Sequence, residues 1–178
     1  MKNDEVERLD LSSWPLPDEY LIELGRVGAL WAILESFLNI CIGKLAGFNE
    51  LADPKPFILV NHASVPQKID MLSTLCEQLA PEFPHLQRYA AVVAKIRAAQ
   101  KLRNQFLHNG LSQDPETGGF KLAEGSARGS LKTRVTPVRI ADIRRASVEI
   151  HLAHLALYKL VLKRELSPIW ERRESGKR

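Results

Sequence analysis

The stretch from Pro17 to Ala46 constrains the fold most, because its pattern predicts one long helix that is apolar on more than one side. Pro17 suits a first helical turn, and Gly47 favours a helix end. A helix with so wide an apolar surface must be covered by several other elements. Its main seam follows spacings of three and four residues and consists of Leu24, Gly28, Trp31, Glu35, Leu38, Ile42 and Leu45, with a second apolar set at Leu30, Ile33, Leu34, Phe37 and Cys41.

Three further segments have the apolar period of long helices. The second helix is expected to open at Ser64, and the third to run from about residue 85 to 108, ended by Asn109-Gly110 in a left-handed conformation. The last is predicted to begin with Thr136 as N-cap and Pro137 in its first turn, and to end near Glu165.

Two connecting segments are less regular. The stretch "FILV" at residues 57–60 is a short buried piece that the pattern leaves open between helix and strand. Residues 112–138 contain turn residues around "FKLAE" and "SLKTRV", which favours a basic β-hairpin or an ordered loop. The sum is an all-α fold, a four-to-five-helix bundle with this insert before the last long helix.

The chain is predicted to hold one helical domain at residues 17–166, between an N-terminal extension at 1–16 and a basic mobile tail at 167–178. A composition of 45% hydrophobic and 26% charged residues argues against disorder. The longest apolar run is broken by Glu35 and Lys44, which argues against a membrane span, and the charged start lacks the apolar region of a signal peptide. Cys41 and Cys76 are expected to be buried free thiols, which favours a cytoplasmic location.

Positive charge is concentrated in two parts of the chain. Residues 83–113 contain no acidic group, and residues 120–145 hold seven basic groups against Glu124 and Asp142. Such a distribution can attract a polyanion, although it is equally consistent with a solvated basic face.

Glu35 is a carboxylate on the apolar seam of the first helix. Because burying an unpaired carboxylate is costly, Glu35 is expected to find a cation or a hydrogen-bond donor. Two interpretations remain open: a structural ion pair at a partly exposed position, or a carboxylate that orients a catalytic arginine or histidine.

The third helix ends in "RNQFLHNG", which brings Arg103, Asn104 and His108 within six positions. Asn104 and His108 share a helix face, and His108 can swing toward Arg103 as the helix ends. These side chains could simply complement the helix C-terminus. His151 and His154 are interpreted as helix-surface or interface histidines and not as a metal pair, and no Cys/His set has zinc spacing.

The segments "LWAILESFLNICIGKLAG", "SVPQKIDMLSTL" and "LRNQFLHNG" resemble the HEPN family (higher eukaryotes and prokaryotes nucleotide-binding domains). Ribonuclease members of that family carry Arg-x4–6-His, often with a polar residue after the arginine, and Arg103, Asn104 and His108 match this motif. The resemblance covers most of the chain in architecture and rests in detail on few residues.

The resemblance implies a metal-independent endoribonuclease that needs no cofactor and acts as a homodimer with a composite active site. Arg103 would stabilise charge on the phosphate, His108 would transfer a proton, and Asn104 would orient the phosphate or His108; Glu35 is a supporting candidate only. The products would be a 2′,3′-cyclic phosphate and a 5′-hydroxyl. The cations expected to hold the RNA backbone are Lys101, Lys121, Arg128, Lys132 and Arg134.

The proposed biological role is that of a toxin or defence effector, with an antitoxin or regulatory protein as a further partner. The alternative is a non-catalytic HEPN-like bundle that binds RNA or a partner protein. Cleavage of RNA in EDTA would separate the two.

Overall fold

A computed structural model describes residues 15–48, 53–126, 129 and 132–172. Over these residues the chain folds into five α-helices, one short 3-10 helix and one three-stranded antiparallel sheet, as the fold class predicted. The elements are α2 (Asp18–Leu45), α3 (Lys55–Val60), α4 (Val65–Leu79), η1 (Pro84–Arg88), α5 (Tyr89–His108), β1 (Gly110–Gln113), β2 (Phe120–Ser126), β3 (Lys132–Val138) and α6 (Ile140–Leu162).

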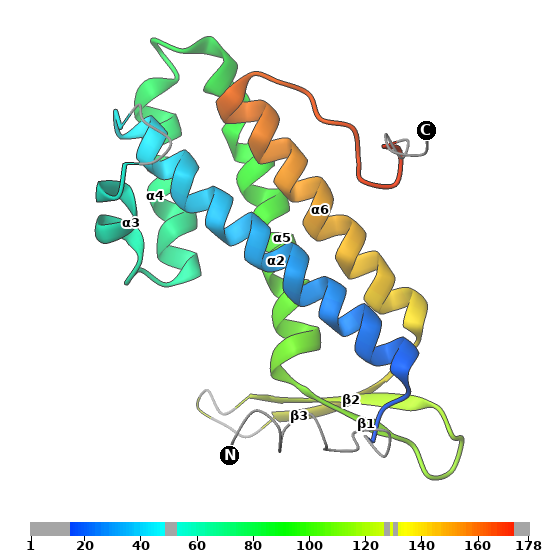
Figure 1. Cartoon of the computed structure of the whole chain (residues 1–178). Helices are drawn as coiled ribbons and strands as arrows, with labels where there is room; N and C mark the ends of the chain where they lie inside the picture. The colour runs from blue at the N-terminus through cyan, green and yellow to red at the C-terminus, as the bar shows by residue number, and fades with distance from the viewer. Residues whose placement is uncertain (1–14, 49–52, 127–128, 130–131, 173–178) are drawn as a thin grey trace, which may run out of the picture.

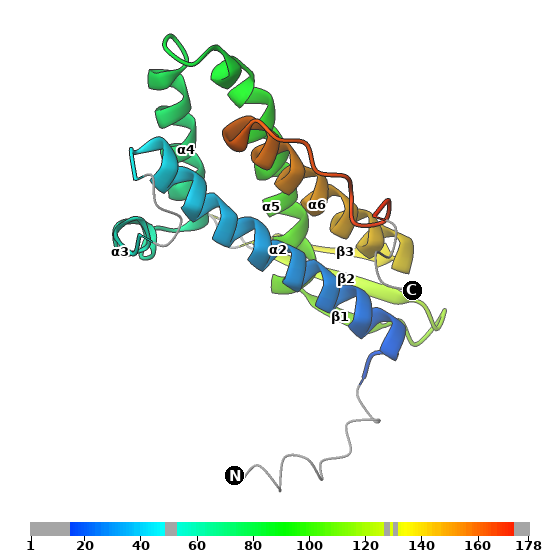
Figure 2. The same ribbon diagram turned by 45° about the horizontal axis from the view of Figure 1, so that its top comes forward.

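The three longest helices lie side by side, and the sheet crosses one end of them (Figures 1 and 2). The starts of α2 and α6 lie at the sheet end of the bundle, whereas α5 runs back toward the sheet and continues into β1. The rings of Tyr20 on α2 and Phe120 on β2 are 4.3 Å apart, which fastens the sheet to the start of α2. This topology places the end of α5, where the Arg-x4-His motif lies, between the bundle and the sheet.

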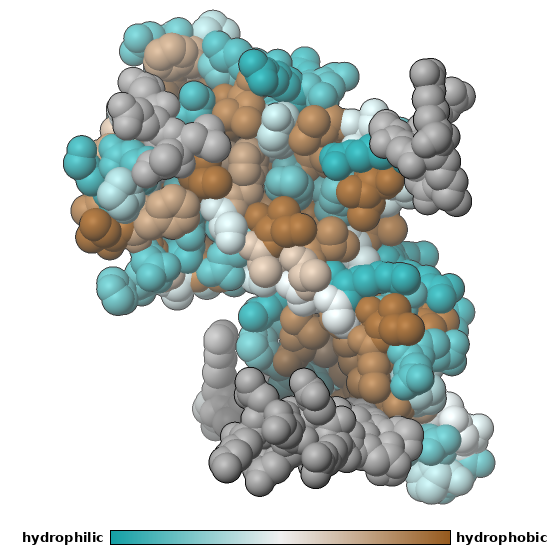
Figure 3. Space-filling model, in the orientation of Figure 1, coloured by the Kyte–Doolittle hydropathy of each residue, from teal (hydrophilic) through white to brown (hydrophobic). Residues whose placement is uncertain are grey.

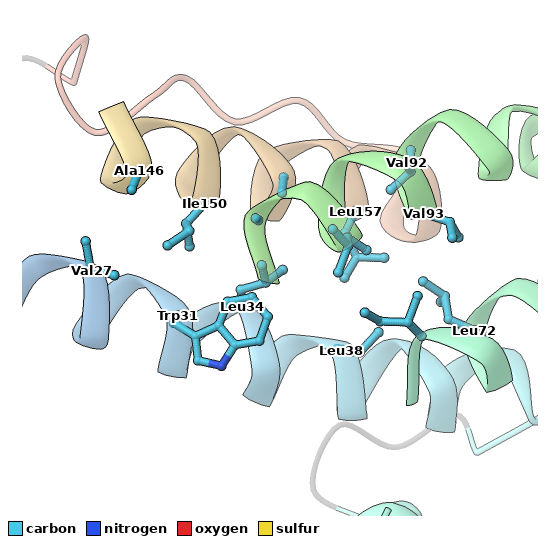
Figure 4. Close-up of a cluster of buried hydrophobic side chains, with 14 of the residues drawn as sticks. Val27, Trp31, Leu34, Leu38, Leu72, Val92, Val93, Ala146, Ile150 and Leu157 are labelled. Carbon is cyan, nitrogen blue, oxygen red and sulfur yellow. The ribbon is translucent and has the colours of Figure 1, made fainter. Parts of the chain in front are cut away.

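A continuous apolar core joins α2, α4, α5 and α6. Figure 4 shows the row of α2 side chains facing α6 and α5. The wide apolar surface predicted for the first helix is therefore covered by several helices, which accounts for its pattern. Buried members of the core include Val27, Trp31, Leu34, Leu38, Leu72, Ile96, Ile143, Ile150 and Leu157.

The segment that the pattern left open, "FILV", belongs to the short helix α3. Pro56 packs so tightly on α2 that a Cβ at Gly43 would lie 2.5 Å from the Pro56 Cβ. The next helix, α4, opens as predicted at Ser64, whose backbone N–H donates to the Gln67 side chain at 2.8 Å.

The third helix ends where the sequence predicted, but for a different reason. Asn109 has an extended backbone (φ −109, ψ 151) and not a left-handed one, because the chain leaves α5 directly into β1. The Asn109 side-chain amide donates to the backbone oxygen of Gln105 at 2.9 Å, which satisfies one of the free carbonyls at the helix end.

The insert differs from a simple hairpin because β1 adds a third strand, in the order β1-β2-β3. The predicted start of the last helix at Thr136 and Pro137 is wrong: both residues lie in β3, paired with Leu122 and Lys121. Proline is tolerated there because β3 is an edge strand, where a missing N–H costs little. The last helix, α6, instead opens at Arg139, whose N–H donates to the Asp142 carboxylate at 3.0 Å, and it ends at Leu162.

Several apolar side chains reach the surface along α2, on the face turned toward the viewer in Figure 3. Two α2 residues, Ile22 and Ile33, are about half exposed, at 54% and 52%. In the described part of the chain, no helix is both long and apolar enough to cross a membrane.

Candidate functional site

The three motif side chains meet at the C-terminal end of α5. The Arg103 Nη1 donates to the Asn104 Oδ1 at 3.0 Å and also contacts the His108 Nε2. Because a guanidinium has only donors, the His108 Nε2 is the acceptor in this contact. His108 is exposed, and Arg103 and Asn104 are partly buried. The motif therefore forms a local cluster with one cation and one accessible imidazole.

The Arg103 guanidinium lies over the indole of Trp31, with its Cζ 5.8 Å from the ring centroid. Trp31 belongs to α2 and is only 4% exposed. This distance is within the range in which a cation is attracted to the face of an aromatic ring. A side chain from a second helix therefore supports the motif arginine, and the motif alone does not reveal this.

Glu35 lies one turn after Trp31 and forms no hydrogen bond or ion pair with Arg103 or His108. One of its carboxylate oxygens accepts the Trp31 Nε1–H at 3.1 Å, and the other accepts the Lys68 Nζ, also at 3.1 Å. The carboxylate is therefore a member of a structural ion pair that also holds the indole beneath Arg103. Lys68, on α4, was not among the predicted site residues, although the cost of burying Glu35 unpaired predicted that a cation or a hydrogen-bond donor would meet it.

The guanidinium of Arg103 retains capacity for an anion. No ion pair found within the described residues involves Arg103. Its Nε is buried and has no acceptor in the part of the chain that the structure describes. A guanidinium without a carboxylate partner can stabilise an anionic phosphate, and the imidazole beside it can transfer a proton to or from a reacting oxygen.

Four of the five expected RNA-binding cations lie within the described residues, and they fall into two groups. Lys101, Lys132 and Arg134 are exposed, on α5 and β3. Lys121 is instead bound to Asp114, with 2.8 Å between its Nζ and the carboxylate. Arg128 lies outside the described residues.

Arg134 also lines a hollow of about 340 Å³ between the end of α5 and the sheet. Gln105, two residues after Arg103, contributes to the same hollow, together with Glu124 and Asp142. One predicted RNA-binding cation therefore lies close to the motif helix, although two carboxylates share the hollow with it.

Two histidines, His151 and His154, lie one turn apart on α6. Burial lowers the pKa of both His151 and His154 from the ordinary value of 6.5. The His151 Nε2 accepts the backbone N–H of Ile169 at 3.1 Å, so this histidine fastens the segment after α6 to the helix. Among the described residues no group of three or more His, Cys, Asp or Glu side chains is arranged to hold a metal ion.

Comparison with protein-family models, curated proteins and solved structures finds no match to the chain.

Proposed function

We propose that this protein is an endoribonuclease of the HEPN type, with Arg103 and His108 at its catalytic centre. The observation that carries the proposal is the direct contact of Arg103 with both Asn104 and His108 at an accessible helix end. A cation and a proton-transfer group side by side are what phosphodiester cleavage requires.

In the proposed reaction the 2′-hydroxyl oxygen of the RNA attacks the adjacent phosphorus, and the bond from phosphorus to the 5′-oxygen breaks. The 2′-hydroxyl loses its proton to a base, and the departing 5′-oxygen gains one. Arg103 balances the charge on the non-bridging oxygens, for which its planar guanidinium is suited. His108 is one of the two proton-transfer groups, and Asn104 orients the guanidinium through its side-chain oxygen.

A single protomer contributes one His108, whereas the reaction needs a proton removed and a proton supplied. A homodimer that joins two motif clusters would provide both groups. Exposed alanines of α5 (Ala90, Ala91, Ala94 and Ala98) and the exposed part of α2 are the surfaces through which we propose that the two copies meet. The RNA backbone would be held by Lys101, Lys132 and Arg134, with binding that weakens as salt rises.

The proposed setting is the cytoplasm, where the enzyme would act as a toxin or defence effector controlled by an antitoxin or regulatory protein. A second function is a non-catalytic module that binds a partner protein. It is favoured by the apolar residues exposed on α3, where Ile58 and Leu59 are 69% and 67% exposed.

The experiment that tests the proposed chemistry uses a DNA oligonucleotide with one ribonucleotide. Cleavage on the 3′ side of that ribonucleotide alone, with a 2′,3′-cyclic phosphate on one product and a 5′-hydroxyl on the other, is expected. A 2′-O-methyl group at the same position should abolish cleavage, since it removes the nucleophile. Cleavage of the all-deoxy oligonucleotide would contradict the mechanism.

A further inference from the structure

We propose that Trp31 is a positioning residue for Arg103, and that the ion pair of the buried Lys68 with the partly exposed Glu35 holds Trp31 in place while keeping the carboxylate away from the guanidinium. This inference rests on the proposed function, because it assigns a role in that reaction. It joins three helices, since Trp31 and Glu35 come from α2, Lys68 from α4 and Arg103 from α5.

The indole is a suitable support for an arginine that must bind phosphate. A carboxylate in contact with Arg103 would hold the guanidinium firmly, but it would also compete with the phosphate for the same N–H donors. An aromatic face attracts the cation without occupying those donors. Trp31 is buried, so its ring presents a fixed surface to Arg103 at 5.8 Å.

The orientation of that ring depends on Glu35. The indole N–H is the one polar group of Trp31, and it donates to the Glu35 Oε2 at 3.1 Å. Without this acceptor, the buried indole would lose the hydrogen bond that favours its present side-chain conformation over others. A tryptophan at this position therefore requires an acceptor one helical turn away, where Glu35 stands.

Glu35 in turn depends on Lys68. The Lys68 side chain is only 4% exposed, so its ammonium must be paired, and its Nζ lies 3.1 Å from the Glu35 Oε1. Both carboxylate oxygens are thus occupied, one by each partner. The charge of Glu35 is cancelled by Lys68, which leaves the charge of Arg103 available to a ligand.

This arrangement predicts a ranking of the activities of the single and double variants that simple loss of packing does not predict. Removing Lys68 alone leaves an uncompensated carboxylate near the indole, which then attracts Arg103 away from the phosphate position. Removing the charges of both Lys68 and Glu35 eliminates that attraction. The double variant is therefore expected to be more active than Lys68→Met.

The test compares Lys68→Met, Glu35→Gln, the double variant and Trp31→Leu, with Trp31→Phe as the conservative change. The matched control is Arg97→Met, which breaks an exposed ion pair that also involves α4, where Arg97 of α5 meets Asp70 of α4 at 2.6 Å. Circular dichroism first establishes that each variant is folded at the assay temperature.

In steady-state RNA cleavage, Lys68→Met and Trp31→Leu should lower kcat by about tenfold to a hundredfold, the range expected when a catalytic group is displaced by about 1 Å. The double variant should recover most of this loss, Trp31→Phe should retain more activity than Trp31→Leu, and Arg97→Met should match the wild type. Wild-type kcat in Lys68→Met, or a double variant as impaired as Lys68→Met, would overturn the inference.

A second readout does not require cleavage. In a W14F/W170F background, Trp31 is the sole tryptophan of the three in the chain. Its fluorescence should change on Arg103→Ala and on Lys68→Met, and return toward the starting spectrum when Glu35→Gln is added to Lys68→Met. A spectrum unaffected by Lys68→Met would refute the positioning role even if the wild type cleaves RNA. Absence of cleavage by the wild type, with these spectral changes present, would instead refute the proposed function alone.

Discussion

Lys121 of β2 forms an ion pair with Asp114, the residue that follows β1, at a distance of 2.8 Å. Asp114 is only 3% exposed, and it also accepts the hydroxyl of Thr117 at 2.6 Å and the backbone N–H of Glu116 at 3.3 Å. Its carboxylate therefore organises the turn between β1 and β2. Lys121 completes that turn, which gives it a structural role, whereas Lys132 and Arg134 on β3 form none of the ion pairs found among the described residues.

The first prediction separates Lys121 from the exposed cations. Lys121→Ala is expected to lower the thermal unfolding midpoint, because it leaves the buried Asp114 carboxylate without its cation. Lys132→Ala should leave the midpoint unchanged and weaken RNA binding, with a smaller dependence of affinity on salt. Thermal melts and salt titrations of both variants check this. Equal midpoints for the two variants would contradict the assignment.

The same turn predicts a dependence of stability on pH. The hydrogen bonds and charge of Lys121, followed by Thr117, lower the pKa of Asp114 below its ordinary value of 3.8. Because the folded state binds this proton more weakly than the unfolded state, the stabilisation is present at neutral pH and is lost as the pH falls below 3.8. Asp114→Asn should thus be less stable than the wild type at pH 7, and the difference in unfolding midpoint should shrink in acid. A difference that is constant with pH would argue against the ion pair.

The contact between Gly43 and Pro56 predicts a large difference between two chemically identical substitutions. Gly43→Ala should destabilise the protein by about 1–3 kcal/mol, the usual cost of overpacking, because the new Cβ would meet Pro56. Gly25, on the same helix, has no atom within 4 Å of an added Cβ. Gly25→Ala should stabilise by about 0.5–1 kcal/mol through helix propensity. Denaturant unfolding measures both, and similar effects at the two positions would refute the close packing of α3 on α2.

The segment after α6 should detach from His151 in acid. Burial, followed by the charge of Arg172, lowers the pKa of His151 below its ordinary value of 6.5. The folded form therefore prefers the neutral imidazole, whose Nε2 accepts the Ile169 N–H, and this stabilisation is present above pH 6.5 and lost as the pH falls below it. His154 also faces His151, from one turn later on α6, and its pKa is lowered as well.

Exchange of the Ile169 amide hydrogen measures this contact. Protection should decrease as the pH falls from 7 to 5, after correction for the intrinsic pH dependence of exchange. His151→Gln is the control, because glutamine offers an acceptor that does not titrate, so its protection should be independent of pH. The same pH dependence in both proteins would exclude His151 as the titrating group.

The long helices could be predicted because apolar residues recur every three or four positions over many turns, and because Pro17, Gly47 and Ser64 mark helix ends. The predictions failed where the same local signal fits two structures. Thr136-Pro137 has the composition of a helix start, but it occupies an edge strand whose pairing with β2 is decided by the sheet. Asn109-Gly110 suggested a left-handed helix end, and the chain instead continues directly into β1.

Within the site, the contact of His108 with Arg103 agrees with the expectation that His108 swings toward the guanidinium at the helix end, whereas the contact of Arg103 with the adjacent Asn104 was not predicted. Trp31 and Lys68 could not be found in this way. Their relation to Arg103 depends on how α2, α4 and α5 pack, and no local pattern encodes that packing. Glu35 indicated only that a cation or a hydrogen-bond donor would meet it, and left the identity of that partner open.

The most direct test of the central claim is cleavage of purified single-stranded RNA in excess EDTA by the wild type, Arg103→Ala, His108→Ala and Lys95→Ala. Lys95 is an exposed cation of the same helix, outside the motif, so its variant controls for the loss of positive charge. We predict that the wild type and Lys95→Ala cleave equally. Arg103→Ala should lose activity by about 10²–10³-fold and His108→Ala by about 10²–10⁴-fold. Wild-type rates in both motif variants, or no cleavage by any of the four proteins, would contradict the assignment of Arg103 and His108 as a ribonuclease site.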